Sequence, residues 1–153
     1  MDFHLAQINV ARLLAALDSP LISEFVANLE SVNALADASP GFVWRLQAEG
    51  GDATSIRVFD DDMIIVNLSV WESLEALRTF VDASTHRGVL ARRTEWFEPA
   101  NEAHLAVWWV PWGTNPTVQE AIDRLLARRA DGPTERAFTL KTVFPQPSSV
   151  DAG

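Results

Sequence analysis

Cysteine is absent from the 153-residue chain. Its absence excludes disulfides, thiolate nucleophiles, zinc-thiolate sites and iron–sulfur clusters. Basic residues are scarce as well, since 12 Lys and Arg stand against 21 Asp and Glu, for a formal net charge of -9. Because nucleic-acid binding depends on cations that displace counterions from phosphates, we expect no nucleic-acid partner.

Targeting and membrane-spanning patterns are also missing. Residues 1–10 carry Asp2, His4, Gln7 and Asn9 instead of a cationic start followed by an apolar stretch, so they do not resemble a signal or transit peptide. No apolar run approaches the roughly 20 residues that a membrane-spanning helix needs. We therefore expect a cytoplasmic protein with no membrane partner.

The common local signatures of catalysis and metal binding do not occur. The chain has no Gly-x-Ser-x-Gly elbow, no Gly-rich phosphate loop and no His-Glu-x-x-His motif, and its three histidines are scattered. The run Asp60-Asp61-Asp62 lacks the ligand spacing of a calcium loop and is typical of a solvated turn. The sequence therefore predicts no metal site.

What the chain does have is enough apolar material for one core. With 48% hydrophobic residues, a chain of this length forms a single domain without covalent cross-links. We assign this domain to residues 1–140. Pro145, Pro147, Ser148 and Ser149 predict a flexible tail over residues 141–153.

Hydrophobic periodicity predicts the order of the elements. Alternation indicates strands at 5–13, 41–47, 64–71 and 104–110, whereas 55–59 either pairs with 41–47 or simply leads onward. Apolar stripes of three-and-four spacing indicate helices at 22–36, 74–81 with a second piece at 85–96, and 118–126. The order strand, helix, strand, strand, helix, strand, helix is the split βαβ pattern of an α+β ferredoxin-like fold with an antiparallel sheet and an extra C-terminal helix.

This arrangement also predicts self-association. Helices cover one face of such a sheet, and we expect the opposite face to be apolar and exposed in a single chain. A free monomer rarely tolerates so large an apolar patch. Face-to-face pairing into a homodimer would cover it.

Polar residues stand where packing alone would favour aliphatic ones. Asn9 lies in the first strand, Asn33 interrupts the stripe of the first helix, and Asn67 and Ser69 share a strand face. An unsatisfied buried amide costs about 1 to 3 kcal/mol, so each needs a partner. Either these groups bond one another or nearby backbone, or they line a ligand pocket against the sheet.

A helical side and an unusual tryptophan content extend this hypothesis. His86, Leu90, Arg93 and Phe97 follow spacings of four, three and four, which places an imidazole, a guanidinium and a ring on one side. Surface solvation explains such residues equally well. Five of the six tryptophans fall on or beside predicted sheet or pocket elements, where they suit either a flat apolar ligand or a core and dimer interface: Trp44, Trp71, Trp96, Trp108 and Trp109.

Five segments carry a resemblance to a known family: residues 5–9, 39–45 and 66–73, His86, and residues 95–97. In these the chain resembles a bacterial family of unknown function related to the antibiotic-biosynthesis monooxygenases, which are dimeric α+β barrel proteins. The resemblance runs from about residue 5 to residue 138. It implies a ferredoxin-like protomer, a back-to-back dimer and a pocket between sheet and helices.

The resemblance also implies candidate site residues. Quinone-forming monooxygenases of this superfamily use an Asn and a Trp four residues later, which Asn67 and Trp71 resemble. Haem-degrading relatives use an Asn on the first strand, a Trp after the third and a His on the next helix, which Asn9, Trp71 and His86 resemble. The resemblance therefore implies either chemistry without a cofactor or haem bound through His86.

Three functions follow from these residues. The leading hypothesis is a monooxygenase-like enzyme that uses no metal or flavin and acts on a small aromatic or polyketide-like molecule, with Asn67 and Trp71 stabilising its anion and His86 or Arg93 relaying a proton. The ligand-binding residues would be Asn9, Asn33, Trp44, Ser69, Trp96 and Trp108. The alternatives are a haem-binding or haem-degrading protein, with His86 as the iron ligand, and a carrier or sensor without catalysis.

Overall fold

The computed structural model describes residues 3–15, 19–46, 64–86, 96–98 and 104–147, although not the side chains of residues 26–32 and 84–86. The elements run in the order β1 (Phe3–Arg12), α1 (Ser23–Ala38), β2 (Phe42–Arg45), β3 (Ile64–Trp71), α2 (Leu74–His86), β4 (Leu105–Pro111) and α4 (Val118–Asp131). This order confirms the predicted one. The segment 55–59 and nearly all of the second helical piece, 85–96, lie outside the described residues.

The strands form one antiparallel sheet with the order β2-β3-β1-β4. The first strand therefore lies inside the sheet, between β3 and β4, which is the split βαβ arrangement. The α+β ferredoxin-like fold with an antiparallel sheet is thus confirmed, as is the extra C-terminal helix.

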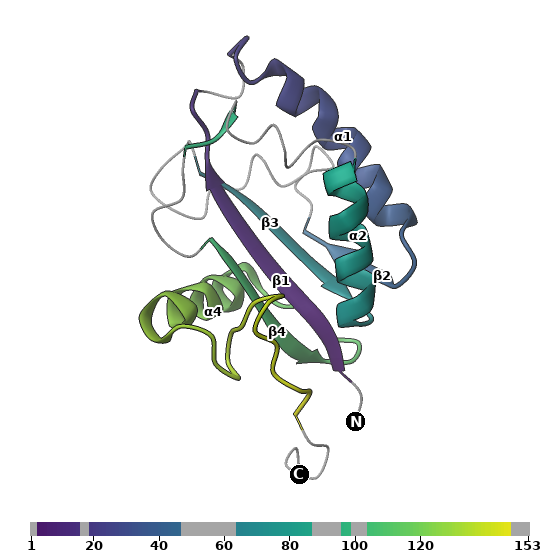
Figure 1. Ribbon diagram of the computed structural model, residues 1–153, viewed down its shortest axis with the longest axis vertical. Coiled ribbons are helices and arrows are strands. Elements are labelled where there is room, and N and C mark those ends of the chain that lie inside the picture. Colours follow the sequence, from purple (N-terminus) through teal and green to yellow (C-terminus); the bar gives the residue numbers. More distant parts are fainter. Residues whose placement is uncertain (1–2, 16–18, 47–63, 87–95, 99–103, 148–153) are drawn as a thin grey trace.

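The two faces of the sheet carry different helices. Alternation along β1 sends Leu5 to a cluster that includes Ala36 of α1 and Leu77 of α2, and sends Ile8 to a cluster that includes Leu125 of α4. We call these sides the α1/α2 face and the α4 face. Figure 1 shows α1 beside α2 on one side of the strands and α4 away from both.

The α4 face is buried within the single chain. Ile8, Leu68 and Trp108 on this face have exposed fractions of 0%, 1% and 0%. The prediction that this face stays open in a monomer is therefore wrong. The prediction fails because α4 packs across this face and contributes the buried Ala121 and Leu125 of its apolar stripe.

Two hydrogen bonds stabilise α4, one at its start and one to the beginning of β4. Thr117 caps the helix, since its hydroxyl oxygen accepts a hydrogen bond from the Glu120 backbone N–H at 3.0 Å. Near the other end of the helix, the Arg128 guanidinium donates to the Leu105 carbonyl. Burial lowers the pKa of Arg128 below its usual value, because desolvation disfavours the charged form.

The chain beyond α4 returns to the α1/α2 face along the edge strand β4. Phe138 forms a bridge with Val107 through backbone hydrogen bonds of 2.9 and 2.8 Å. Farther on, Trp109 Nε1 donates to the Phe144 carbonyl at 2.9 Å, and Phe144 packs beside Phe138. The packed part of the chain thus reaches at least Phe144, past the expected start of the tail at residue 141.

Candidate functional site

Polar residues of β1 and β3, among them the predicted Asn9, Asn67 and Ser69, meet on the α1/α2 face. The strand register pairs Gln7 with Ser69 and Asn9 with Asn67. In the next strand, Arg45 of β2 pairs with Ser69, so Gln7, Ser69 and Arg45 form one row across three strands. Residues paired in this way point to the same side of a sheet. A polar strip therefore crosses a face that is otherwise packed with apolar side chains.

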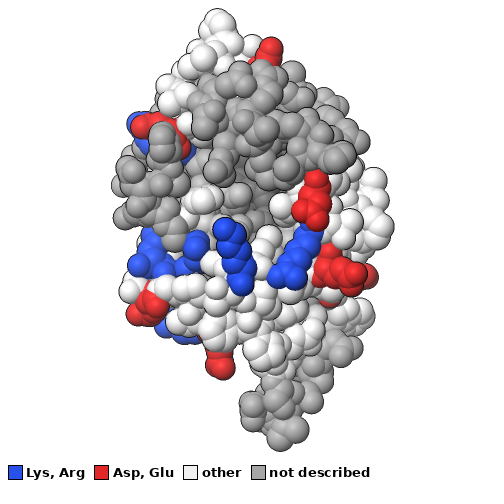
Figure 2. All heavy atoms as spheres, viewed as in Figure 1, with Lys and Arg blue, Asp and Glu red and all other residues white. Residues whose placement is uncertain are grey.

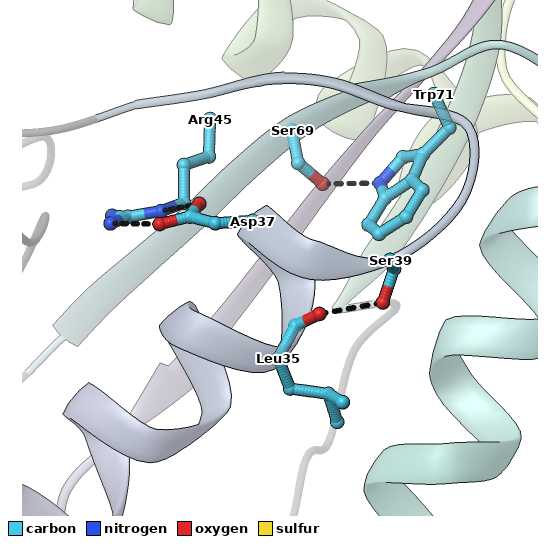
Figure 3. Close-up of polar contacts among 6 residues, drawn as sticks. All are labelled: Leu35, Asp37, Ser39, Arg45, Ser69 and Trp71. Atoms are coloured by element: carbon cyan, nitrogen blue, oxygen red, sulfur yellow. Dashed lines mark hydrogen bonds and ion pairs between the residues drawn. The ribbon is translucent and has the colours of Figure 1, made fainter.

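Four of these side chains form a hydrogen-bonded group, which we call the Gln7 cluster: Gln7, Asn67, Ser69 and Trp71. Gln7 Nε2 donates to Asn67 Oδ1 at 2.6 Å and to Ser69 Oγ at 2.8 Å. Trp71 Nε1 donates to Ser69 Oγ at 2.9 Å, as Figure 3 shows. Ser69 Oγ thus accepts from both neighbours, and the nitrogen donors of Gln7 and Trp71 are bound inside the protein.

Trp71 belongs to the core beneath α2. Its side chain is fully buried and stacks on Phe80 at 4.9 Å, with Phe42 edge-on at 5.4 Å. Because its only donor is already bound to Ser69, the indole N–H is not directed at a ligand here. In this conformation Trp71 contributes to the site through its hydrogen bond to Ser69 and its packing in the core.

Asn67 is the member of the cluster that faces outward. It is exposed, whereas Gln7 and Ser69 are buried at 7% and 6% exposure. Its Oδ1 accepts from Gln7, and no bond from its Nδ2 to another described residue is present. The cluster therefore presents an amide N–H at the exposed edge of the α1/α2 face, and such a donor can bond an oxygen that carries negative charge.

Arg45 adds a positive charge next to the cluster. Its guanidinium forms a two-point ion pair with Asp37 in the last turn of α1, through Nε–Oδ1 at 2.8 Å and Nη2–Oδ2 at 3.3 Å (Figure 3). The Arg45 side chain is only 13% exposed. Sequence reasoning did not select Arg45. A charged residue inside the aromatic segment 42–46 was the available signal.

The other predicted ligand-binding residues are divided between places. Asn9 is half-buried beside Asn67, and Asn33 is half-buried on α1. Trp96 is buried in a separate cluster with Leu13 and Phe25 on the α1/α2 face. The structure thus brings Asn9 next to the Gln7 cluster and assigns Trp96 to core packing.

Two predicted tryptophans lie on the α4 face instead. Trp44 packs against the cluster that contains Val70, its partner in the β2–β3 pairing, and Trp108 is fully buried in the same cluster. The sheet separates both from Asn67. The Trp108 Nε1 atom and the Nδ1 atom of buried His4 lack hydrogen-bond partners among the described residues.

The predicted proton-relay residues are not placed. His86 ends α2, but its side chain lies outside the described part of the chain, as does all of Arg93. Among the described residues, no group of three or more His, Cys, Asp or Glu side chains could hold a metal ion. The haem hypothesis depends on His86 and so stays a prediction.

The surface charge of the described residues is uneven. Figure 2 shows basic side chains in a band across the middle of the viewed face, with acidic side chains toward its margins. The described basic side chains thus gather in one band, although the whole chain has a formal net charge of -9. None of the described helices combines the length and apolarity needed to cross a bilayer.

Comparison with known proteins gives a family and a fold. The family model called domain of unknown function DUF3291 matches residues 4–152. The chain belongs to the DUF3291 family. No curated protein matches the sequence.

Solved structures with this fold include SnoaB, a cofactor-independent oxygenase from Streptomyces nogalater. It matches with a TM-score of 0.50 and 17% identity over 75% of this chain and 99% of its own. A Chloroflexus aurantiacus protein, provisionally assigned as an antibiotic biosynthesis monooxygenase, matches with a TM-score of 0.47 and 18% identity over 74% of this chain and 97% of its own. The DUF3291 chain thus shares the α+β fold of an oxygenase.

Proposed function

We propose that this DUF3291 protein is a cofactor-independent, monooxygenase-like enzyme that acts on a small aromatic or polyketide-like molecule on the α1/α2 face. The single observation that carries the proposal is the exposed amide of Asn67. Its oxygen is bound by buried Gln7, which also bonds buried Ser69. The shared fold with a cofactor-independent oxygenase supports it. Asn9 beside Asn67 and the neighbouring Arg45 extend the polar strip.

The proposed reaction needs only the substrate and dioxygen. A ring CH2 group flanked by two aromatic rings, with a carbonyl opposite it in the same ring, loses a proton, and the resulting anion places charge on the carbonyl oxygen through the conjugated rings. That oxygen accepts the Asn67 N–H, which stabilises the anion. The carbanion carbon then transfers electrons to dioxygen and forms a C–O bond. Protonation gives a hydroperoxide, and loss of water leaves a second carbonyl, so CH2 and O2 become C=O and H2O.

Proton transfer is assigned to His86 or Arg93 in this proposal. Trp71 takes part as a positioning residue, since it donates to Ser69 and packs against Phe80. This division of labour differs from the expectation that Trp71 itself meets the anion. The roles differ because the Trp71 indole N–H donates to Ser69 and so is not available to the anion.

Oxygen consumption tests the proposal. Purified protein is mixed with an anthrone, and dioxygen uptake is followed with an electrode while quinone formation is followed by absorbance. We expect equal amounts of dioxygen consumed and quinone formed, and a loss of about 100-fold in rate for Asn67→Ala. The exposed Gln119 on α4 provides the control variant, Gln119→Ala. Absence of turnover across a series of anthrones and quinols would contradict the proposal.

The same samples separate the alternatives. A carrier or sensor binds the anthrone without oxygen uptake, and a haem protein shows a Soret band after haemin addition that disappears in His86→Ala. The homodimer also stays a prediction. An exposed apolar sheet face no longer supports it, because the α4 face is buried within one chain, so it rests on the family resemblance. Native mass spectrometry measures the oligomeric state directly.

A further inference from the structure

We infer that Gln7 determines the polarity of this site: by bonding Asn67 Oδ1, it turns the Asn67 N–H outward and makes the site selective for anionic oxygen over neutral ligands of the same shape. The inference rests on the proposed function for its ligand class. It assigns Gln7 as a positioning residue, because Gln7 is buried beside Asn67 and acts on the ligand through that neighbour.

Each hydrogen bond of the Gln7 cluster runs from a side-chain nitrogen to a side-chain oxygen. An indole nitrogen only donates, so Ser69 Oγ must act as the acceptor for Trp71. The Gln7 carboxamide has two N–H groups on Nε2, and these reach Ser69 Oγ and Asn67 Oδ1. With its oxygen bound inward, the planar Asn67 carboxamide directs its NH2 group away from Gln7.

Burial explains why this orientation persists. Gln7 and Ser69 have exposed fractions of 7% and 6%, so water competes weakly for their hydrogen bonds. Trp71, which supports Ser69, is itself held between Phe42 and Phe80. The aromatic packing beneath α2 is thus connected, through Ser69 and Gln7, to the amide of exposed Asn67.

Without the Gln7 donors, the Asn67 carboxamide should no longer keep its N–H group outward. In Gln7→Met, the Asn67 carboxamide has no inward donor and rotates freely, so its oxygen faces the ligand for part of the time. A carbonyl oxygen repels a phenolate. It has much less effect on an aromatic ether, which lacks the negative charge. The expected signature is therefore a loss of selectivity between two ligands.

A matched ligand pair measures that selectivity. The probes are the anion of 4-nitro-1-naphthol and its neutral methyl ether, each titrated into the intact protein and followed by tryptophan fluorescence and probe absorbance. We expect wild type to prefer the phenolate by about tenfold and to lower the pKa of the bound naphthol. We expect Gln7→Met to lose most of that preference while its ether affinity stays within about twofold.

Three further variants control the measurement. Asn67→Leu removes the amide and should abolish the preference, and the double variant Gln7→Met/Asn67→Leu should resemble Asn67→Leu because Gln7 acts through Asn67. Gln119→Met removes an exposed glutamine that bonds Asp123 on α4 and should retain wild-type selectivity. Gln7→Leu removes both donors without adding a charge, so its preference must also fall if Gln7→Met does not fold.

The outcomes distinguish the two proposals. If Asn67→Leu loses the preference but Gln7→Met and Gln7→Leu keep it, the inference about Gln7 is wrong and the proposed site stands. Additive losses in the double variant overturn the inference as well. If wild type binds neither probe, or Asn67→Leu behaves as wild type, the proposed ligand site itself is wrong.

Discussion

Gly41→Ala should destabilise the protein by more than its backbone conformation alone predicts. Gly41 has a φ of 82°, and a Cβ added there would lie 2.5 Å from the Cβ of Ala76 in α2. A non-glycine residue at such a φ costs about 1–2 kcal/mol. Forcing a methyl group into packed atoms adds about 1–3 kcal/mol. We therefore expect a loss of about 2–5 kcal/mol in the free energy of unfolding.

Gly113→Ala is the matched control, because Gly113 has a φ of 84° and no atom of the described residues lies within 4 Å of an added Cβ. Urea unfolding should give a loss of about 1–2 kcal/mol for this variant. Ala76→Gly in the Gly41→Ala background should recover the steric part, less about 1 kcal/mol for glycine in a helix. Equal losses for Gly41→Ala and Gly113→Ala would refute the close contact with α2.

Other variants test the cluster, the cap and the core. Ser69→Ala removes the acceptor of two buried donors, so it should cost about 1–3 kcal/mol in urea unfolding and shift the indole N–H resonance of its donor in NMR spectra. Thr117→Ala should cost about 1 kcal/mol through loss of the helix cap, whereas Thr117→Ser should be nearly neutral. Leu125→Ala should cost about 2–5 kcal/mol because Leu125 is fully buried, and Leu126→Ala, at 47% exposure, should cost much less. Similar melting temperatures for the two leucine variants would contradict the docking of α4.

The order of elements could be predicted from the sequence because periodicity is a local property. Alternation over residues 64–71 predicts a strand, and the structure has β3 at Ile64–Trp71. The Thr117 capping box marks the start of α4 in the same way. The place of α4 was not predictable by this route, because an apolar stripe does not specify which apolar surface it covers. The error about an open sheet face followed from that gap.

In the candidate site too, periodicity predicted part of the arrangement and packing decided the rest. Alternation alone put Asn67 and Ser69 on one side of a strand, and Asn9 in another strand. It did not show that the Trp71 N–H binds Ser69, nor that Trp44 and Trp108 lie across the sheet from these residues. Pairing register and packing between distant segments decide such contacts.

The sequence by itself determined the fold class, the lack of thiol chemistry and the polar residues on β1 and β3, because composition and periodicity act over short distances along the chain. Only the tertiary structure decided that α4 closes the second face, that Arg45 joins the polar strip, and that Gln7 bonds the oxygen of Asn67. These outcomes depend on residues far apart in the chain, such as Gln7 and Asn67, which are 60 positions apart and meet only after the sheet has formed.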